Sequence, residues 1–126
     1  MALLDDVSKY IETNVTELVE VENLFKNYYP DDPDMVVSVI DLGGLPPNKY
    51  RPTREKKIEV KYRTKRYPEG IELGNQIFNL FHAFENYQMG DFYILASYAD
   101  TEVSYLYEDS KNRKEFSIEL VFMHKN

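Results

Sequence analysis

The chain has 126 residues, no cysteine, and a formal net charge of −7 from 22 acidic and 15 basic side chains. This length fits one domain with one core, and the lack of cysteine excludes a disulfide framework and a thiolate metal site. The acidic balance argues against broad affinity for nucleic acid or anionic lipid. No apolar run approaches the roughly 20 residues that span a bilayer, and the acidic start does not resemble a signal peptide, so we expect a soluble protein with no membrane partner.

The basic side chains are concentrated in the middle of the chain, in the segment YRPTREKKIEVKYRTKRY, Tyr50–Tyr67. Both ends are acidic, and this asymmetry suits head-to-tail contact between identical subunits. The chain also contains 11 tyrosines. Tyrosine joins apolar area to a polar tip, which favours wet protein interfaces, although sheet surfaces use it as well.

Residues 1–42 predict a helix and a buried strand, separated by an ambiguous segment. The helix is indicated by apolar side chains at helical spacing: Leu3, Leu4, Val7, Tyr10 and Ile11. The segment Val15–Tyr29 fits a helix or a strand almost equally, and we interpret it as a loop with a strand near Leu24–Tyr28. Met35–Leu42 is rich in β-branched residues and bounded by prolines and glycines, which is typical of a buried strand.

The second half begins with a loop, GGLPPNKYRPT, whose prolines cannot donate to a sheet. Strict alternation then places Ile58, Val60 and Tyr62 on one face of a half-buried strand. A second helix carries a broad apolar stripe and is expected to end at Gly90; the stripe is Leu73, Ile77, Leu80, Phe81 and Phe84. Three strands follow, the last two joined by a turn at EDSKNRK; they are Phe92–Tyr98, Val103–Tyr107 and Glu115–Met123.

This order does not alternate strictly between strands and helices. It predicts a single α+β domain with a mostly antiparallel, mixed sheet of about four to six strands and two main helices packed on one face. Polar loops are expected over residues 43–54 and 63–70.

One catalytic interpretation is a metal-dependent nuclease of the PD-(D/E)xK type. Glu59 and Lys61 are two residues apart on a strand and so share a face, and Asp34 or Asp41 would complete a Mg²⁺ site. However, the ExK pattern arises by chance in most charged strands, and the net charge opposes DNA binding. His82 and His124 have no spacing to another histidine, and the acidic DDPD loop lacks the glycine and distal glutamate of an EF-hand. A solvated turn is the simpler interpretation of that loop.

The segments in their order resemble the tail terminator family of long-tailed bacteriophages, also described as minor capsid or tail completion proteins. The resemblance is carried by the helix ALLDDVSKYIE, a proline-led strand that ends in DLGGLPP, a second helix, and the late hairpin YLYEDSKNRKEFSIELVF. In the EDSKNR turn the family often has a glycine that this chain lacks. Together the segments cover most of the chain.

The resemblance implies a structural virion protein without an active site or cofactor. It would form a ring, typically a hexamer, that caps the tail tube, ends tube polymerisation and offers its other face to head-completion and neck proteins. Its expected place is the tail or neck of the virion, after assembly in the host cytoplasm. No sequence-specific nucleic acid is expected, although DNA would pass through the ring. Another head-completion or neck protein of similar size stays an alternative.

The residues we expect at the assembly interface lie in the basic loops. Tyr50, Arg51 and Arg54 would form a docking arm, with Lys65 and Arg66 on the neighbouring loop. Charged loops of this kind set specificity and register more than affinity. The alternative, that these are only solvated loop residues, stays open.

Overall fold

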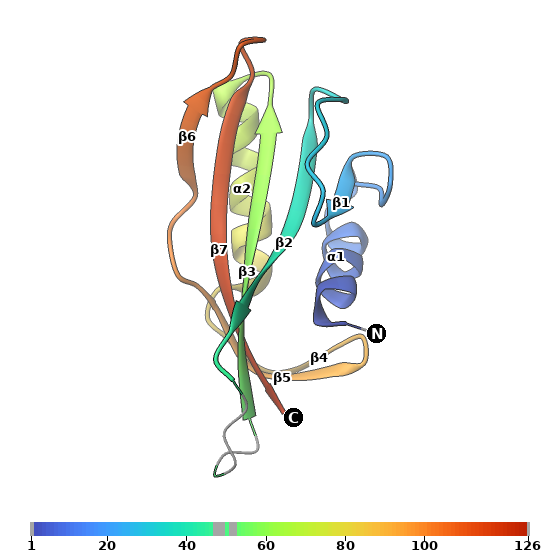
Figure 1. Cartoon of the computed structure of the whole chain (residues 1–126), viewed down its shortest axis with the longest axis vertical. Coiled ribbons are helices and arrows are strands. Elements are labelled where there is room, and N and C mark those ends of the chain that lie inside the picture. The colour runs from blue at the N-terminus through green and yellow to red at the C-terminus, as the bar shows by residue number, and fades with distance from the viewer. Residues whose placement is uncertain (1, 47–49, 51–52, 126) are drawn as a thin grey trace.

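The computed structural model describes residues 2–46, 50 and 53–125, and within these residues two helices pack on a sheet of seven strands (Figure 1). The elements in chain order are α1 (Leu3–Asn14), β1 (Leu24–Lys26), β2 (Val36–Gly44), β3 (Thr53–Thr64), α2 (Tyr67–Phe81), β4 (Phe84–Met89), β5 (Phe92–Ala99), β6 (Ser104–Glu108) and β7 (Lys114–Lys125). The α+β class is confirmed, with one strand more than the upper expectation.

The sheet is built around the two longest strands, β3 and β7, which pair antiparallel along their full length. The strand order is β1-β2-β3-β7-β5-β4, and β6 also pairs with β7. β1 is parallel to β2, and the other strand pairs are antiparallel. The short strand expected near Leu24 is therefore confirmed, and the sheet is mixed as predicted.

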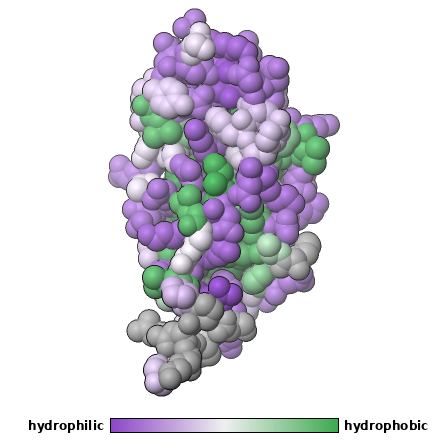
Figure 2. All heavy atoms as spheres, viewed as in Figure 1, coloured by the Kyte–Doolittle hydropathy of each residue, from purple (hydrophilic) through white to green (hydrophobic). Residues whose placement is uncertain are grey.

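One core lies between the sheet and both helices. The alternation in β3 is confirmed, because Ile58, Val60 and Tyr62 are fully buried and lie beside Leu120, Ile118 and Phe116 of β7. The apolar stripes of α1 and α2 belong to the same buried cluster. The other face of the sheet, here called the open face, carries the alternate residues of each strand. Figure 2 shows that face, with hydrophobic side chains among hydrophilic ones across its middle and a mostly hydrophilic upper end.

Two glycines let α2 lie close to the sheet. The hydroxyl of Tyr62 donates to the carbonyl of Gly70 at 2.7 Å in the core. A Cβ atom at Gly74 would collide with the same hydroxyl and with Val103. The ring of Tyr62 stacks on Phe116 with centroids 5.0 Å apart. The helix is thus fixed at a separation that larger residues at these positions would not allow.

The predicted extension of the second helix to Gly90 is wrong. α2 ends at Phe81, Ala83 takes a positive φ of 62°, and the following residues form β4, which pairs with β5 across a turn at Gly90. Phe84 therefore lies on an edge strand outside the stripe, where its side chain is exposed. Tertiary pairing with β5 overrides the apolar spacing that continued the helical pattern.

Neither helix among the described residues is long and apolar enough to cross a membrane.

The polar loop predicted over residues 63–70 is also wrong. β3 continues through Thr64 and α2 begins at Tyr67, so only Lys65 and Arg66 connect them. Pro68 lies in the first turn of the helix, where its missing N–H is not needed.

The EDSKNRK turn between β6 and β7 is confirmed. Asn112 has a φ of 62° there. It therefore takes a left-handed conformation that glycine adopts readily and that asparagine also tolerates.

Candidate functional site

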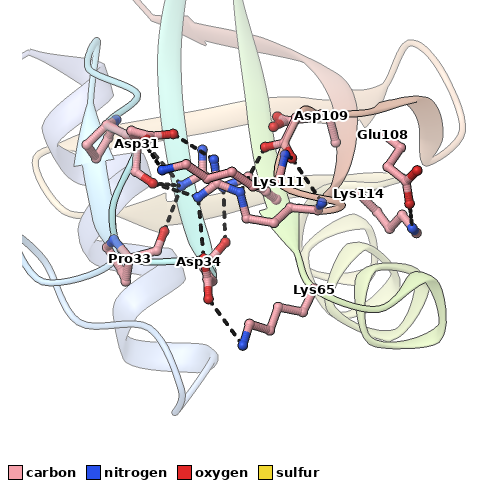
Figure 3. Close-up of polar contacts among 12 residues, drawn as sticks. Asp31, Pro33, Asp34, Lys65, Glu108, Asp109, Lys111 and Lys114 are labelled. Atoms are coloured by element: carbon pink, nitrogen blue, oxygen red, sulfur yellow. Dashed lines mark hydrogen bonds and ion pairs between the residues drawn. The ribbon is translucent and has the colours of Figure 1, made fainter.

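The acidic loop between β1 and β2, Tyr29–Asp34, is held against the open face by two buried arginines; we call it the clamped loop. Arg63 comes from the end of β3, and Arg113 comes from the turn before β7. Both are almost fully buried, at 2% and 3% exposure. Figure 3 shows two of the loop's carboxylates beside lysines, Asp31 beside Lys111 and Asp34 beside Lys65.

Arg63 binds the backbone of the clamped loop. Its guanidinium donates to four carbonyl oxygens, those of Pro30 at 3.0 Å, Asp31 at 3.1 Å, Pro33 at 2.6 Å and Asp34 at 3.0 Å. A loop that folds over a sheet exposes few carbonyls to water, so an internal donor must satisfy them. Arg63 supplies that donor for almost the whole loop.

Arg113 binds the loop's carboxylates and links them to the β6–β7 turn. It donates to Oδ1 of Asp31 at 2.6 Å and to Oδ2 of Asp109 at 2.8 Å, and it lies 3.4 Å from Asp34. Hydrogen bonds from Lys111 and then Arg113 lower the pKa of Asp31 to about 2. Burial acts to lower the pKa of Arg113, but its bonds to Asp31 and Asp109 raise it above the ordinary value. The ion pairs of Arg113 with Asp31 and with Asp109 therefore stay charged across the usual pH range.

Tyr29 completes the contact between the loop and the sheet. Its ring lies beneath Lys61 and Arg63, with the ring centroid 4.8 Å from Nζ and 5.2 Å from Cζ. Its hydroxyl donates to the buried carboxylate of Glu115. Burial, and then this bond to Glu115, raise the pKa of Tyr29, so the hydroxyl remains a donor. The clamped loop is therefore an ordered part of the fold and more than a solvated turn.

The four residues of the nuclease interpretation do not converge. Asp34 lies in the clamped loop, and Lys61 lies over Tyr29. Glu59 accepts a hydrogen bond from Ser117 at 2.7 Å. Asp41 pairs with Lys56 at 2.9 Å, and its register beside Ile58 points it to the opposite face from Glu59. In the part of the chain that the structure describes, no group of three or more His, Asp or Glu could hold a metal ion.

The expected assembly residues do not form one patch. Tyr50, 81% exposed, and the exposed Arg54 lie at the hairpin between β2 and β3, whereas Lys65 and Arg66 lie beyond the far end of β3. The two groups are separated by the length of that strand, roughly 36 Å, so the expectation of neighbouring loops is wrong. Lys65 also pairs with Asp34 at 3.3 Å within the subunit. Arg51 lies outside the described residues.

Sequence reasoning missed the two arginines that organise the clamped loop. Arg63 belongs to the polar side of the alternating strand, where a solvated position is the ordinary interpretation. Arg113 lies in a turn full of polar residues. The loop residues that Arg63 binds are 29 to 33 positions away in the sequence, and those that Arg113 binds are 79 to 82 positions away. No local spacing therefore reveals these contacts. The only available signal was the concentration of aspartates and prolines in residues 29–34.

A shallow groove crosses the outer surface of α2. It encloses about 550 Å³ and is lined by Tyr67, Pro68, Ile71, Glu72, Asn75, Gln76 and Asn79. A second hollow of about 270 Å³ continues from it, sharing Ile71 and Asn75 and adding Phe78, Glu102 and Val103. The lining residues include two glutamates and no lysine or arginine. The groove is therefore apolar with an acidic rim.

Comparison with known proteins gives a family and a fold. A family model described as bacteriophage tail terminator protein matches residues 7–124. A solved structure superposes with a TM-score of 0.58 at 9% sequence identity, covering 97% of this chain and 95% of that chain. At this identity the likeness concerns the fold alone. No curated protein matches the sequence significantly.

Proposed function

The chain belongs to the bacteriophage tail terminator family, and we propose that it forms a hexameric ring that caps the finished tail tube. Membership makes it a structural component of the virion tail, with a role in tail completion. In the proposal, the ring covers the last layer of the tube and so stops the addition of tube subunits. Its other face binds the head-completion proteins of the neck, after assembly in the host cytoplasm, and DNA passes through the opening.

The observation that supports a ring most directly is the separation of charge between the hairpin and the body. We call Leu42–Arg54 the arm. The arm contains three basic residues and no acidic one, so it carries +3 and leaves −10 for the rest of the chain. A subunit with a basic segment and an acidic remainder is complementary to copies of itself in a head-to-tail contact. Such a heterologous contact closes into a ring when the rotation between subunits allows it.

The two ends of the molecule supply two different binding surfaces. At one end, Tyr50, Arg51 and Arg54 belong to the arm and bind the next subunit. At the other end, Lys65 and Arg66 lie beside the clamped loop and bind a tail or neck partner. Arg54 and Arg66 form no ion pair within the described part of the chain, so both charges are available to another protein. Because the clamped loop is held by buried arginines, the second surface is preorganised for binding.

The test is the mass of the purified protein by light scattering over a range of concentrations, alone and with purified tail tubes. A species of hexamer mass, or a monomer that forms rings only on tube ends, supports the proposal. The variant Arg51→Glu/Arg54→Glu should keep its far-ultraviolet circular dichroism and lose ring formation. A control, Lys9→Glu/Lys26→Glu, makes the same change of net charge away from the arm. It also breaks the ion pairs of these lysines with Glu12 and Asp5, so its circular dichroism is recorded as well, and it should assemble normally.

Three outcomes oppose parts of the proposal. Assembly by Arg51→Glu/Arg54→Glu at wild-type concentrations rejects the arm as the contact. A wild-type chain that stays monomeric and leaves tube ends uncapped rejects the ring. Binding to filled heads, without binding to tubes, assigns the chain to the neck instead.

A further inference from the structure

The groove on α2 has the chemistry of a receptor for a basic, proline-rich segment. Its floor is formed by an exposed tyrosine, Tyr67 at 47% exposure, beside Pro68 and Ile71. Its rim carries Glu72, and Glu69 is exposed one turn earlier. Neither glutamate forms an ion pair with any residue that the structure describes. Their charges therefore act on whatever binds the groove.

The arm of the same chain is a segment of that kind. Its sequence LGGLPPNKYRPTR contains three prolines and three basic residues. Leu42 and Leu45 are exposed, Leu45 at 61%, so the arm also offers apolar area. Proline-rich segments bind aromatic-lined grooves because the extended polyproline conformation is already restricted before binding. Flanking bases are then attracted by an acidic rim.

The arm cannot reach the tyrosine end of its own groove. Thr53 begins β3, and Tyr67 lies just past the other end of that strand, roughly 36 Å away. Only residues 45–52 lie between β2 and β3, so the tip is at most four residues, roughly 14 Å, from either strand end. Figure 1 shows the start of β3 and the start of α2 at opposite ends of the molecule. Binding at Tyr67 must therefore occur between two copies.

We propose that the arm of one subunit docks in the α2 groove of the next subunit. The prolines and Leu45 lie against Tyr67, Pro68 and Ile71, and the basic side chains of the arm reach the glutamates of the rim. This inference rests on the proposed ring and assigns the surface that receives the arm. Because the Tyr67 end of the groove and the arm lie at opposite ends of each subunit, the contact is heterologous, as ring closure requires.

Disulfide cross-linking tests the contact directly, because the chain contains no cysteine of its own. The variant Leu45→Cys/Asn75→Cys places one thiol on the arm and one in the groove, both at exposed positions. Oxidation of the full chain under ring-forming conditions should give covalent oligomers up to the ring, with peptides 45 and 75 joined between subunits. The control Leu45→Cys/Glu85→Cys has its second thiol on exposed β4. Equal cross-linking in both variants would overturn the inference.

A charge exchange provides a second test. Glu72→Lys places a base where the arm's bases should bind, and it should raise the concentration for half assembly at least roughly tenfold. Adding Arg51→Glu should restore assembly toward the wild-type value. If Glu72→Lys forms rings at wild-type concentrations, the docking site is refuted while the ring stands. If the wild-type chain forms no ring with or without tubes, the proposed function itself fails.

Discussion

The two ends of β3 use arginine in opposite ways. At the end next to α2, Arg63 is buried and donates to four carbonyls of the clamped loop, and nearby Arg113 binds Asp31 and Asp109. At the end next to the arm, Arg54 is exposed and forms no ion pair with any described residue. The same type of side chain therefore stabilises the fold at one end of β3 and remains available to a partner protein at the other.

The difference follows from desolvation. A buried guanidinium must have its donors satisfied within the protein, so losing it or its partners is strongly unfavourable. An exposed guanidinium keeps its water, and its removal changes folding little. We therefore expect substitutions at the clamped end to affect stability and substitutions at the arm to affect assembly.

The largest expected effect is that of Arg63→Met. Methionine keeps much of the apolar stem but leaves the loop carbonyls without their donor, so the free energy of unfolding should fall by about 3–5 kcal/mol. Urea denaturation followed by circular dichroism measures the change. The matched control Arg54→Met should stay within about 0.5 kcal/mol of wild type. Similar losses in the two variants would show that the ends do not differ.

Tyr29→Phe should have the next largest effect. It removes the hydroxyl that donates to Glu115, which is 3% exposed, and leaves a buried carboxylate without that partner. The free energy of unfolding should fall by about 1–3 kcal/mol in the same urea assay. Tyr98→Phe, at an exposed position of β5, should be nearly neutral. A neutral Tyr29→Phe would mean that the loop contributes little to stability.

Acid should weaken the clamped end through Asp31. Its pKa in the folded chain is about 2, below the ordinary value of 3.8, so its stabilising effect is complete above about pH 5 and is lost as the pH falls through 3.8 toward 2. Asp31→Asn removes this component, and its unfolding midpoint in urea should fall less steeply over that range than the wild-type midpoint. Asp32→Asn changes a neighbouring carboxylate without a hydrogen bond among the described residues and should keep the wild-type slope. Parallel slopes for wild type and Asp31→Asn would contradict the assignment.

The smallest effect on stability is expected for Lys65→Ala. Its ion pair with Asp34 spans 3.3 Å, but the two side chains are 69% and 45% exposed, so the loss should not exceed about 1 kcal/mol. If Lys65 binds a tail or neck partner as proposed, co-sedimentation with purified tails or heads should fall while the urea midpoint hardly changes. A loss of stability without a loss of binding would instead mean that Lys65 serves to hold the clamped loop in place.

Local pattern was enough for most of the fold. The spacing of apolar residues gave α1, the core stripe of α2 and the alternation of β3, because each depends on which residues along one element face the core. The α+β class followed from the order of those elements. The apolar spacing gave a wrong prediction at Phe84, which continues the helical spacing of α2 but belongs to β4. The loop predicted over residues 63–70 was also wrong, because β3 and α2 are separated there by only two residues.

The sequence by itself determined the secondary structure that depends on neighbouring residues, the basic character of the arm, and the resemblance to the tail terminator family. Only the tertiary structure decided that the acidic loop is clamped by Arg63 and Arg113, and that Arg54 and Lys65 lie on opposite ends of the molecule. These contacts join residues far apart in the chain. Their energies depend on burial and on the distance between side chains, and neither is set until the sheet has formed.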